Sequence, residues 1–166
     1  PVTVDNPLAV VSEDGQFSIG NKDMTVYIPA SQSVKAGKAP APVLSVQKGD
    51  RKIGNNRLYA HRKNVERIET LPVEVGELFV KYQMKYYLAG NATYTAWIKV
   101  VQGYPFVILE EEMNGLSKED RVYLDMCWDN FAPVKRFGTQ WDRVFDKASQ
   151  WIGIDTPVHT SYSQED

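Results

Sequence analysis

Cysteine is almost missing from this chain, whose 166 residues include one, Cys127. A single thiol cannot form an internal disulfide, so no disulfide framework is expected, and within the apolar run VYLDMCW we interpret Cys127 as a small buried hydrophobic residue. Histidine is also scarce, with two residues, and no paired His or Cys spacing occurs. This argues against a transition-metal site.

Charge of one sign and long apolar runs are also lacking. The formal net charge is −2 with both signs interspersed, so no basic stripe is available for a nucleic acid. No apolar run reaches the roughly 20 residues of a membrane helix. An anionic polymer remains an open partner, because one segment is locally cationic, although such a run is more often a solvated loop. Its members are Lys48, Arg51, Lys52, Arg57, His61, Arg62 and Lys63.

Familiar catalytic and cofactor motifs are absent. The sequence contains neither a G-x-S-x-G turn nor a glycine-rich phosphate loop, and it has no EF-hand. We therefore assign no catalytic residue and expect no cofactor. A structural calcium ion stays open, with oxygen ligands from Asp125, Asp129 and Asn130 or from the Glu13–Asp14 turn.

Short apolar runs separated by turn residues are what the first half of the sequence does contain. The runs are LAVV, QFSI, MTVYI and VLSV, separated by Gly, Asn, Asp and Pro. Such spacing is typical of strands. We expect an exposed loop at 31–42 and a loop or ragged sheet edge at 49–63.

Two later runs, 79–88 and 93–101, alternate cleanly between polar and apolar residues. In each run the even-numbered residues form the apolar face, which predicts a hairpin with one face on the core. A loop over 89–93 would pair Leu88 with Tyr94 and Lys85 with Trp97.

The next runs, FVILEEEM and RVYLDMCW, are almost continuously apolar and predict central strands covered on both faces. Near the end, apolar residues from Trp141 to Ile152 recur at helical spacing, with Thr139 as a cap and Gly153 as a stop. We therefore predict an all-β antiparallel β-sandwich with one short C-terminal helix. It would be a single domain over 1–160, with a polar tail or linker over 161–166.

Trp97 is the anomaly, because it falls among the polar residues of its run. The same face would carry Tyr87, Lys85, Lys99 and Gln83, so flat rings would lie among long hydrogen-bonding side chains. Pyranose rings present C–H patches flanked by hydroxyl groups, which such a face complements. The alternative is that a second sheet, the 31–42 loop or the C-terminal helix covers Trp97 and makes it part of the core.

Glu110 and Glu112 would share one strand face with Phe106 and Ile108. Paired carboxylates are what glycosidases use, and burial of that face would favour their neutral forms. The alternative is an ordinary charged strand end that pairs with nearby Lys and Arg.

Residues 77–113, ELFVKYQMKYYLAGNATYTAWIKVVQGYPFVILEEEM, together with the upstream QFSIGNKDMTVYIP, resemble noncatalytic β-sandwich domains of bacterial polysaccharide-degrading enzymes. The resemblance implies an accessory or carbohydrate-binding module, secreted or on the cell surface or in the periplasm, that acts beside a catalytic domain. The chain begins at Pro1 rather than Met, so we expect a processed protein or a piece of a larger one. Its partners would be a polysaccharide or oligosaccharide and the neighbouring catalytic domain, with no nucleic acid and no membrane.

Two other functions stay open. One is a spacer or docking domain whose exposed aromatic residues, with Trp141 and Trp151, contact a neighbouring domain. The other is a small glycoside hydrolase that uses Glu110 or Glu112.

Overall fold

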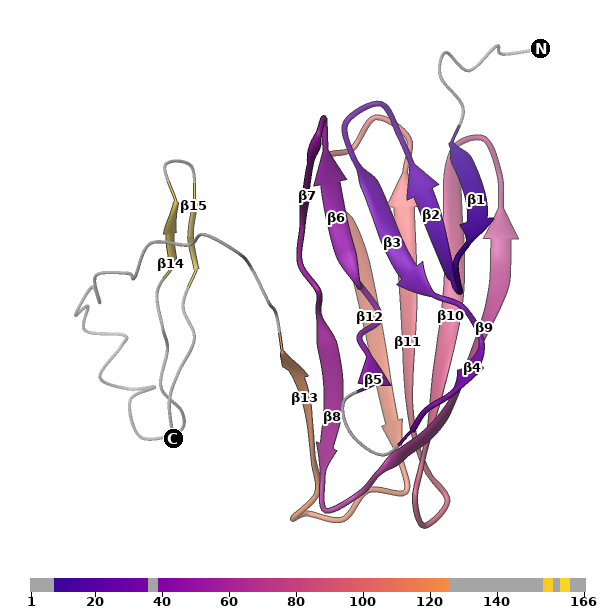
Figure 1. Cartoon of the computed structure of the whole chain (residues 1–166), viewed down its shortest axis with the longest axis vertical. Coiled ribbons are helices and arrows are strands. Elements are labelled where there is room, and N and C mark those ends of the chain that lie inside the picture. Colours follow the sequence, from indigo (N-terminus) through magenta and orange to yellow (C-terminus); the bar gives the residue numbers. More distant parts are fainter. Residues whose placement is uncertain (1–7, 36–38, 126–153, 157–158, 162–166) are drawn as a thin grey trace. The chain divides into compact units, whose positions relative to one another are not determined.

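The structure is a computed structural model, and it describes residues 8–35, 39–125, 154–156 and 159–161. The chain divides into two compact units, Pro1–Cys127 and Trp128–Asp166. Antiparallel sheets make up the described part of the first unit, drawn in indigo to orange in Figure 1. The described part of the second unit is a small hairpin of β14 (Ile154–Thr156) and β15 (His159–Ser161).

Sheet I has five strands in the order β1-β2-β3-β6-β7. These strands span Ala9–Glu13, Gln16–Gly20, Thr25–Pro29, Ser45–Lys48 and Arg51–Ile53. Each hydrogen-bonds to its neighbour in antiparallel fashion. The apolar runs LAVV, QFSI, MTVYI and VLSV all contribute to this sheet.

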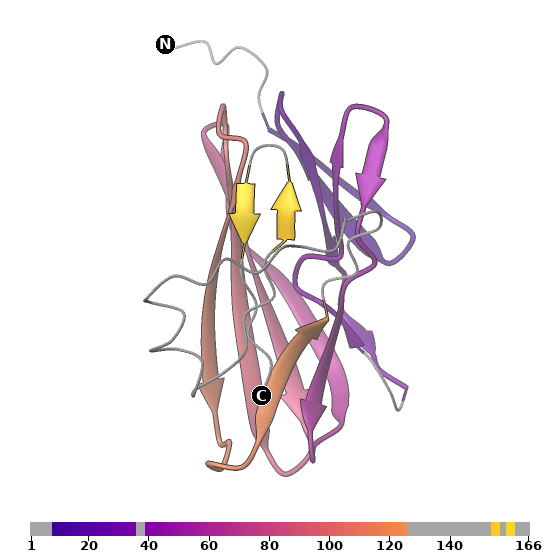
Figure 2. The same cartoon turned by 90° about the vertical axis from the view of Figure 1, so that its left-hand side faces the viewer.

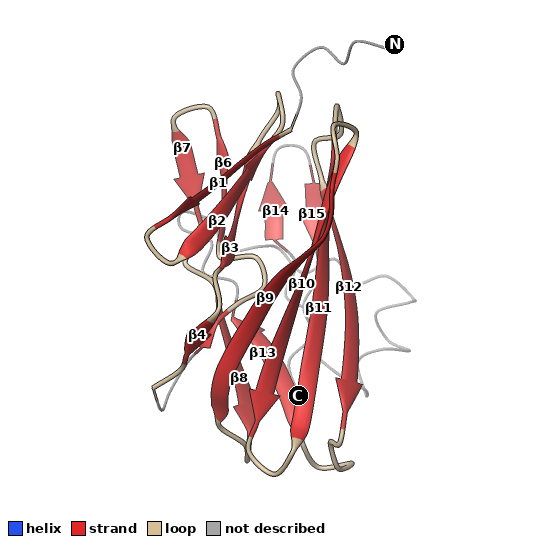
Figure 3. Cartoon of the chain, turned by 90° about the vertical axis from the view of Figure 1, so that its right-hand side faces the viewer, coloured by secondary structure: helices blue, strands red, loops and turns tan. Residues whose placement is uncertain are grey.

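Sheet II has the order β12-β11-β10-β9-β4 and contains the longest strands. They span Val107–Asn114, Ala92–Val101, Phe79–Leu88, Val65–Val75 and Gln32–Ser33. Sheet III has the order β13-β8-β5, with strands Arg121–Asp125, Arg57–His61 and Ala39–Pro40. Figures 1 and 3 show sheets I and III side by side in one layer, with sheet II as the other layer.

The core lies between the two layers, and all three sheets contribute to it. Phe17 of sheet I packs on Tyr82 of sheet II with their ring centroids 5.1 Å apart. Tyr86 of sheet II is fully buried, and its hydroxyl donates a hydrogen bond of 3.0 Å to the Pro40 carbonyl of sheet III. The view in Figure 2 shows that the layers pack face to face without closing into a barrel. The predicted all-β antiparallel sandwich is confirmed.

Alternation in β10 and β11 follows the prediction, because their even-numbered residues from Val80 to Leu88 and from Ala92 to Val100 are buried. The predicted pairing is wrong. Leu88 pairs with Ala92, since the loop contains only Ala89, Gly90 and Asn91, and the last two adopt positive φ angles of 78° and 61°. The difference of two residues leaves every side chain on its predicted face.

Three strand predictions are corrected by the structure. Residues 49–63, expected to be a loop or ragged sheet edge, contain β7 at the edge of sheet I and β8 in the middle of sheet III. The run beginning at Phe106 forms β12, an edge strand of sheet II with mostly exposed side chains, rather than a covered central strand. The run beginning at Arg121 forms β13, which lies at the edge of sheet III. Apolar composition alone did not distinguish edge from centre.

The predicted helix near Trp141 lies outside the described residues. No helix able to cross a membrane occurs in the part of the chain that the structure describes. The expectation of one domain over 1–160 remains a prediction.

Two glycines allow a matched test of backbone packing next to β12. Gly115 and Gly103 have similar φ angles of +69° and +75°. A Cβ at Gly115 would lie 3.2 Å from the Cα atom of Ala92 and 3.3 Å from the carbonyl oxygen of Asn91, whereas a Cβ at Gly103 would meet nothing within 4 Å. Both substitutions to alanine should destabilise the fold by about 1 kcal/mol because of the left-handed backbone.

Gly115→Ala should cost about 1 kcal/mol more, since its contacts are with backbone atoms that cannot rotate away. Chemical denaturation of the two variants measures the difference. Equal midpoints would contradict the close approach of Gly115 to the β10–β11 hairpin.

Candidate functional site

The outer face of sheet II, which points away from the core, carries the five residues that the sequence identified. Gln83, Lys85 and Tyr87 come from β10, and Trp97 and Lys99 come from β11. Each is partly buried, whereas the side chains between them are buried in the core. Trp97 therefore lies on the outer face, where it is partly buried rather than part of the buried core. The predicted helix near Trp141, one of the elements named as a possible cover, lies outside the described residues.

The residues across from Trp97 differ from those expected. Gln83, and not Lys85, pairs with Trp97 on one side, and Glu110 of β12 pairs with it on the other. Lys85 pairs with Thr95 instead. The ring is thus flanked by an amide and a carboxylate, two groups that can exchange hydrogen bonds with hydroxyl groups.

An ion pair crosses the sheet beside Trp97. The Lys81 ammonium group lies 2.7 Å from a carboxylate oxygen of Glu110, although β11 separates their two strands. The Glu110 side chain is 53% exposed and that of Lys81 24%. A bound molecule could therefore still reach the carboxylate. The pair also fixes Glu110 next to the ring.

Tyr87 forms the second aromatic position, and its surroundings are more crowded. The Arg67 guanidinium lies over its ring at 3.4 Å from the centroid, and the Lys85 ammonium lies 5.3 Å from it. The Tyr87 hydroxyl donates a hydrogen bond of 2.5 Å to Glu69, which also pairs with Arg67. One ring face is already occupied by a cation, so Tyr87 offers its edge and hydroxyl rather than an open platform.

Spacing along the strands separates the two aromatic positions. Tyr87 pairs with Thr93, four residues before Trp97 on β11. Four residues of extended strand and one interstrand step place the two rings about 14 Å apart. A ligand that contacts both must therefore extend over several sugar units. Lys99 follows Trp97 by two residues, and its ammonium lies 4.0 Å from the centroid of the Phe79 ring.

The charges on this face balance. The register places four basic and four acidic residues on it, so their sum is 4 − 4 = 0. They are Arg67, Lys81, Lys85, Lys99, Glu69, Glu74, Glu110 and Glu112. A surface with mixed charges and no net field favours neutral, hydroxyl-rich ligands over polyanions.

The Tyr87 cluster gives a pH-dependent prediction. The pKa of Glu69 lies below its ordinary value of 4.5, first because Tyr87 donates a hydrogen bond to it and second because Arg67 does so. Tyr87→Phe keeps the ring but removes the hydroxyl donor, so the pKa of Glu69 should rise towards 4.5. Carboxyl chemical shifts followed through an acid titration measure it.

The lowered pKa of Glu69 determines in which direction the stability of the fold changes with pH. The ionised carboxylate is favoured in the folded chain, so its stabilising contribution is present above pH 4.5 and is lost as the pH falls through the lower folded pKa. Tyr59→Phe, on β8, is the control. An unchanged Glu69 midpoint in Tyr87→Phe would contradict the hydrogen bond.

Glu110 and Glu112 do share a face, as predicted, and the same face carries Trp97. The face is not buried around them, since Phe106 is 49% exposed and Ile108 is 36% exposed. Glu112 accepts a hydrogen bond of 2.6 Å from Asn114. The two carboxylates therefore lie on an open strand edge. Glu111 points to the opposite side, where it accepts a hydrogen bond from the buried Tyr94, and burial of that ring raises the pKa of Tyr94.

Strand β9 was missed by the sequence reasoning, although it supplies Arg67, Glu69 and Leu71 to this face. Register shifts interrupt its pairing with β10 on both sides of the Tyr82–Tyr87 segment. Pro72 lies at one of these irregularities. The bulges break the two-residue period, so the alternation that identified β10 and β11 was not visible.

Metal ligands do not gather in the described part of the chain. Within 8–35, 39–125, 154–156 and 159–161, no group of three or more His, Cys, Asp or Glu side chains is placed to hold an ion. Asp129 and Asn130, proposed as calcium ligands, lie outside these residues, while Asp125 ends β13.

Comparison with known proteins identifies no relative: no family model, curated protein or solved structure matches the chain.

Proposed function

We propose that this chain is a noncatalytic carbohydrate-binding module of a secreted, cell-surface or periplasmic polysaccharide-active enzyme, and that it binds glycan on the outer face of sheet II. The observation that carries the proposal is Trp97, a large ring held on the outer face between Gln83 and Glu110. The sequence resemblance to accessory domains of polysaccharide-degrading enzymes supports the same function.

The chemistry of recognition follows from these positions. The Trp97 indole would stack on the C–H face of one sugar ring, which removes apolar surface from water. Gln83 and Glu110 would exchange hydrogen bonds with the hydroxyl groups at the edges of that ring. Lys85 and Lys99 would contact neighbouring units, and Tyr87 would contact a sugar several units away. The balanced charge of the face favours a neutral glycan.

The test is affinity electrophoresis of the whole chain through gels that contain single polysaccharides: cellulose derivatives, xylan, mannan, β-glucan, pectin and alginate. Retardation by a neutral polymer supports the proposal. A Trp97→Phe variant, which keeps an aromatic face, should be retarded almost as much as the parent chain. Unretarded migration in every gel would contradict glycan binding.

A docking or spacer function is favoured by a different observation. Four apolar side chains near the β9–β10 turn, Leu71, Val73, Val75 and Leu78, are between 53% and 64% exposed. Leu71 pairs with Gln83 and Val75 pairs with Val80, so these exposed side chains are divided between the two faces of the sheet. A neighbouring domain packed on this end of β9 would cover them. Trp141 and Trp151, named for the same function, lie outside the described residues. Absence of glycan binding would favour this alternative.

A further inference from the structure

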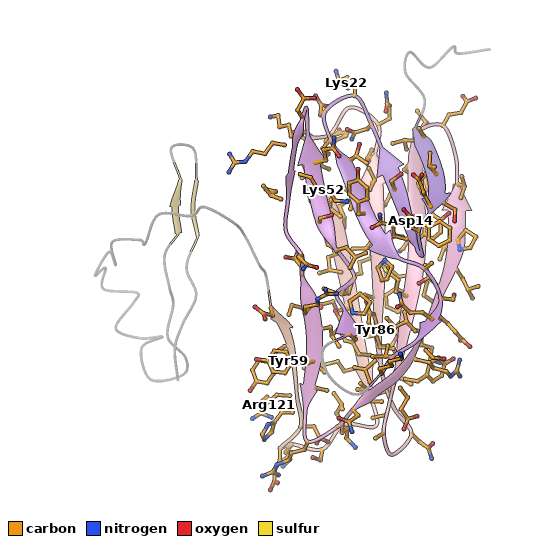
Figure 4. The ribbon with its side chains drawn as sticks, in the orientation of Figure 1. Asp14, Lys22, Lys52, Tyr59, Tyr86 and Arg121 are labelled. Carbon is orange, nitrogen blue, oxygen red and sulfur yellow. The ribbon has the colours of Figure 1, made fainter. Side chains whose placement is uncertain are left out.

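A cleft with a volume of about 820 Å³ lies within the first unit and is lined by residues from all three sheets. Its walls include Gly15 from the β1–β2 turn, Gln32 from β4, Lys52 from β7 and Arg57 from β8. Figure 4 shows Asp14 and Lys52, two of the lining residues, on the layer opposite sheet II. This volume lies within the range of small-ligand sites.

The cleft borders a short segment outside the strands, residues 54–56, which separates β7 from β8. Gly54 has a φ angle of +94°, and Asn56 is fully buried there. The Asn56 side chain donates to the Val43 carbonyl at 3.0 Å, and its backbone NH donates to the Leu44 carbonyl at 2.9 Å. These hydrogen bonds hold the segment between β7 and β8 in one conformation. Gly54 and Asn55 therefore line the cleft on a rigid segment.

Positive charge dominates the lining. Among the described lining residues, Lys35, Lys52 and Arg57 are basic and Asp14 is acidic, so their charges sum to 3 − 1 = +2. None of these four residues takes part in an ion pair within the described part of the chain. The Lys52 ammonium lies instead over the Tyr27 ring, 3.4 Å from its centroid. Arg57 lies directly across from Asp125 of β13. The excess of basic over acidic residues in the described lining attracts an anionic ligand.

We propose that this cleft binds a short acidic oligosaccharide, with Lys52, Arg57 and Lys35 pairing with the carboxylates of uronic acid units. The three cations come from different segments, which suits negative charges spread along a ligand better than one compact phosphate group. Gln16, Gln32 and Asn55 line the same walls and would hydrogen-bond to sugar hydroxyl groups. None of the described lining residues is aromatic, so a nucleotide base would find no ring among them to stack on.

This site is separate from the outer face of sheet II and does not depend on the function proposed for that face. The two surfaces differ in charge, since the outer face sums to zero and the cleft to +2. The expected ligands differ accordingly. A neutral glycan would bind at Trp97, and a uronate oligomer would bind at the cleft.

Isothermal titration of the whole chain with trimers of galacturonate, mannuronate and guluronate tests the proposal, with the carboxyl-reduced neutral trimers and inorganic phosphate as comparison ligands. At least one uronate trimer should bind, and its reduced form should bind at least about tenfold more weakly. Affinity should fall as salt is raised. The double variant Lys52→Gln with Arg57→Gln should lose at least about tenfold in affinity.

The matched control is Lys22→Gln with Lys48→Gln, which removes two exposed lysines that do not line the cleft. It should bind like the parent chain. In ¹⁵N spectra, the amides of Gly15 and Gly54 should shift on titration while the Trp97 indole signal stays in place. The proposal is overturned if no uronate trimer binds, if both double variants lose affinity equally, if phosphate binds more tightly, or if Trp97 shifts and the glycines do not.

Discussion

Replacing Tyr86 with alanine should lower the free energy of unfolding by about 3–5 kcal/mol. Tyr86, labelled in Figure 4, is fully buried, and its ring centroid lies 5.4 Å from that of Tyr94. Burial also raises the pKa of Tyr86 well above its ordinary value, as expected for a phenol enclosed by the core. Truncation would leave a cavity between sheets II and III, which the surrounding strands cannot fill.

The next residue in the chain provides the matched control. Tyr87 points to the outer face, so Tyr87→Ala should cost about 1 kcal/mol, mainly through lost contacts with Arg67 and Glu69. Tyr86→Phe isolates the hydroxyl group, and loss of its hydrogen bond to Pro40 should cost about 1 kcal/mol. Urea denaturation of the three variants measures all of these changes. Equal losses for Tyr86→Ala and Tyr87→Ala would contradict the assignment of the two faces.

Replacing Trp97 with alanine should weaken binding to a neutral polysaccharide by about 1–3 kcal/mol, a loss of roughly 5- to 150-fold in affinity. The ring would supply the main apolar contact of the proposed glycan site. The fold should tolerate the change, since Trp97 is only partly buried. A stability loss of about 1–2 kcal/mol is expected from the lost apolar burial.

Ligand length separates the two aromatic positions on the outer face. A disaccharide cannot reach from Trp97 to Tyr87, since about 14 Å separates them. Tyr87→Ala should therefore weaken the binding of a hexasaccharide and leave that of a disaccharide unchanged, while Trp97→Ala weakens both. Tyr59→Ala, which removes a 38% exposed ring from sheet III, should change neither. Calorimetry of the three variants with the two sugars makes these comparisons, and a disaccharide whose affinity is unchanged by Trp97→Ala would contradict the proposal.

Much of the architecture could be predicted because β10 and β11 obey a strict two-residue period. The core positions from Val80 to Val100 and the outward direction of Trp97 followed from that period alone. The exact pairing was missed because the apolar faces of β10 and β11 coincide in several registers, which differ by two residues. The choice among them depends on whether Asn91 adopts a left-handed conformation, and composition does not determine this.

The edges of the sheets could not be predicted for a related reason. Val107, Ile108 and Leu109 form an apolar run in β12, yet the last two are 36% and 37% exposed at the edge of sheet II. Burial of such a run depends on whether a further strand or layer covers it, and that is a property of the whole fold. The same is true of β13.

The cleft was even less accessible to sequence reasoning. Lys52 and Arg57 stood out only as members of a cationic segment whose ordinary interpretation is a solvated loop. Both line the cleft on either side of the segment 54–56. Lys35, from the loop after β4, and Asp14, from the β1–β2 turn, line the same cleft. Side chains from distant segments meet there because strands and turns of all three sheets border the cleft.

The most direct measurement is the indole NH resonance of Trp97 in the ¹⁵N-labelled chain, assigned by its loss in Trp97→Phe and followed as a neutral oligosaccharide is added. Glycan binding on the outer face of sheet II predicts a saturable shift of this resonance, together with the backbone amides of Gln83 and Glu110. If the oligosaccharide binds while the Trp97 indole stays unmoved, or if no neutral oligosaccharide moves it, the outer face is not the glycan site.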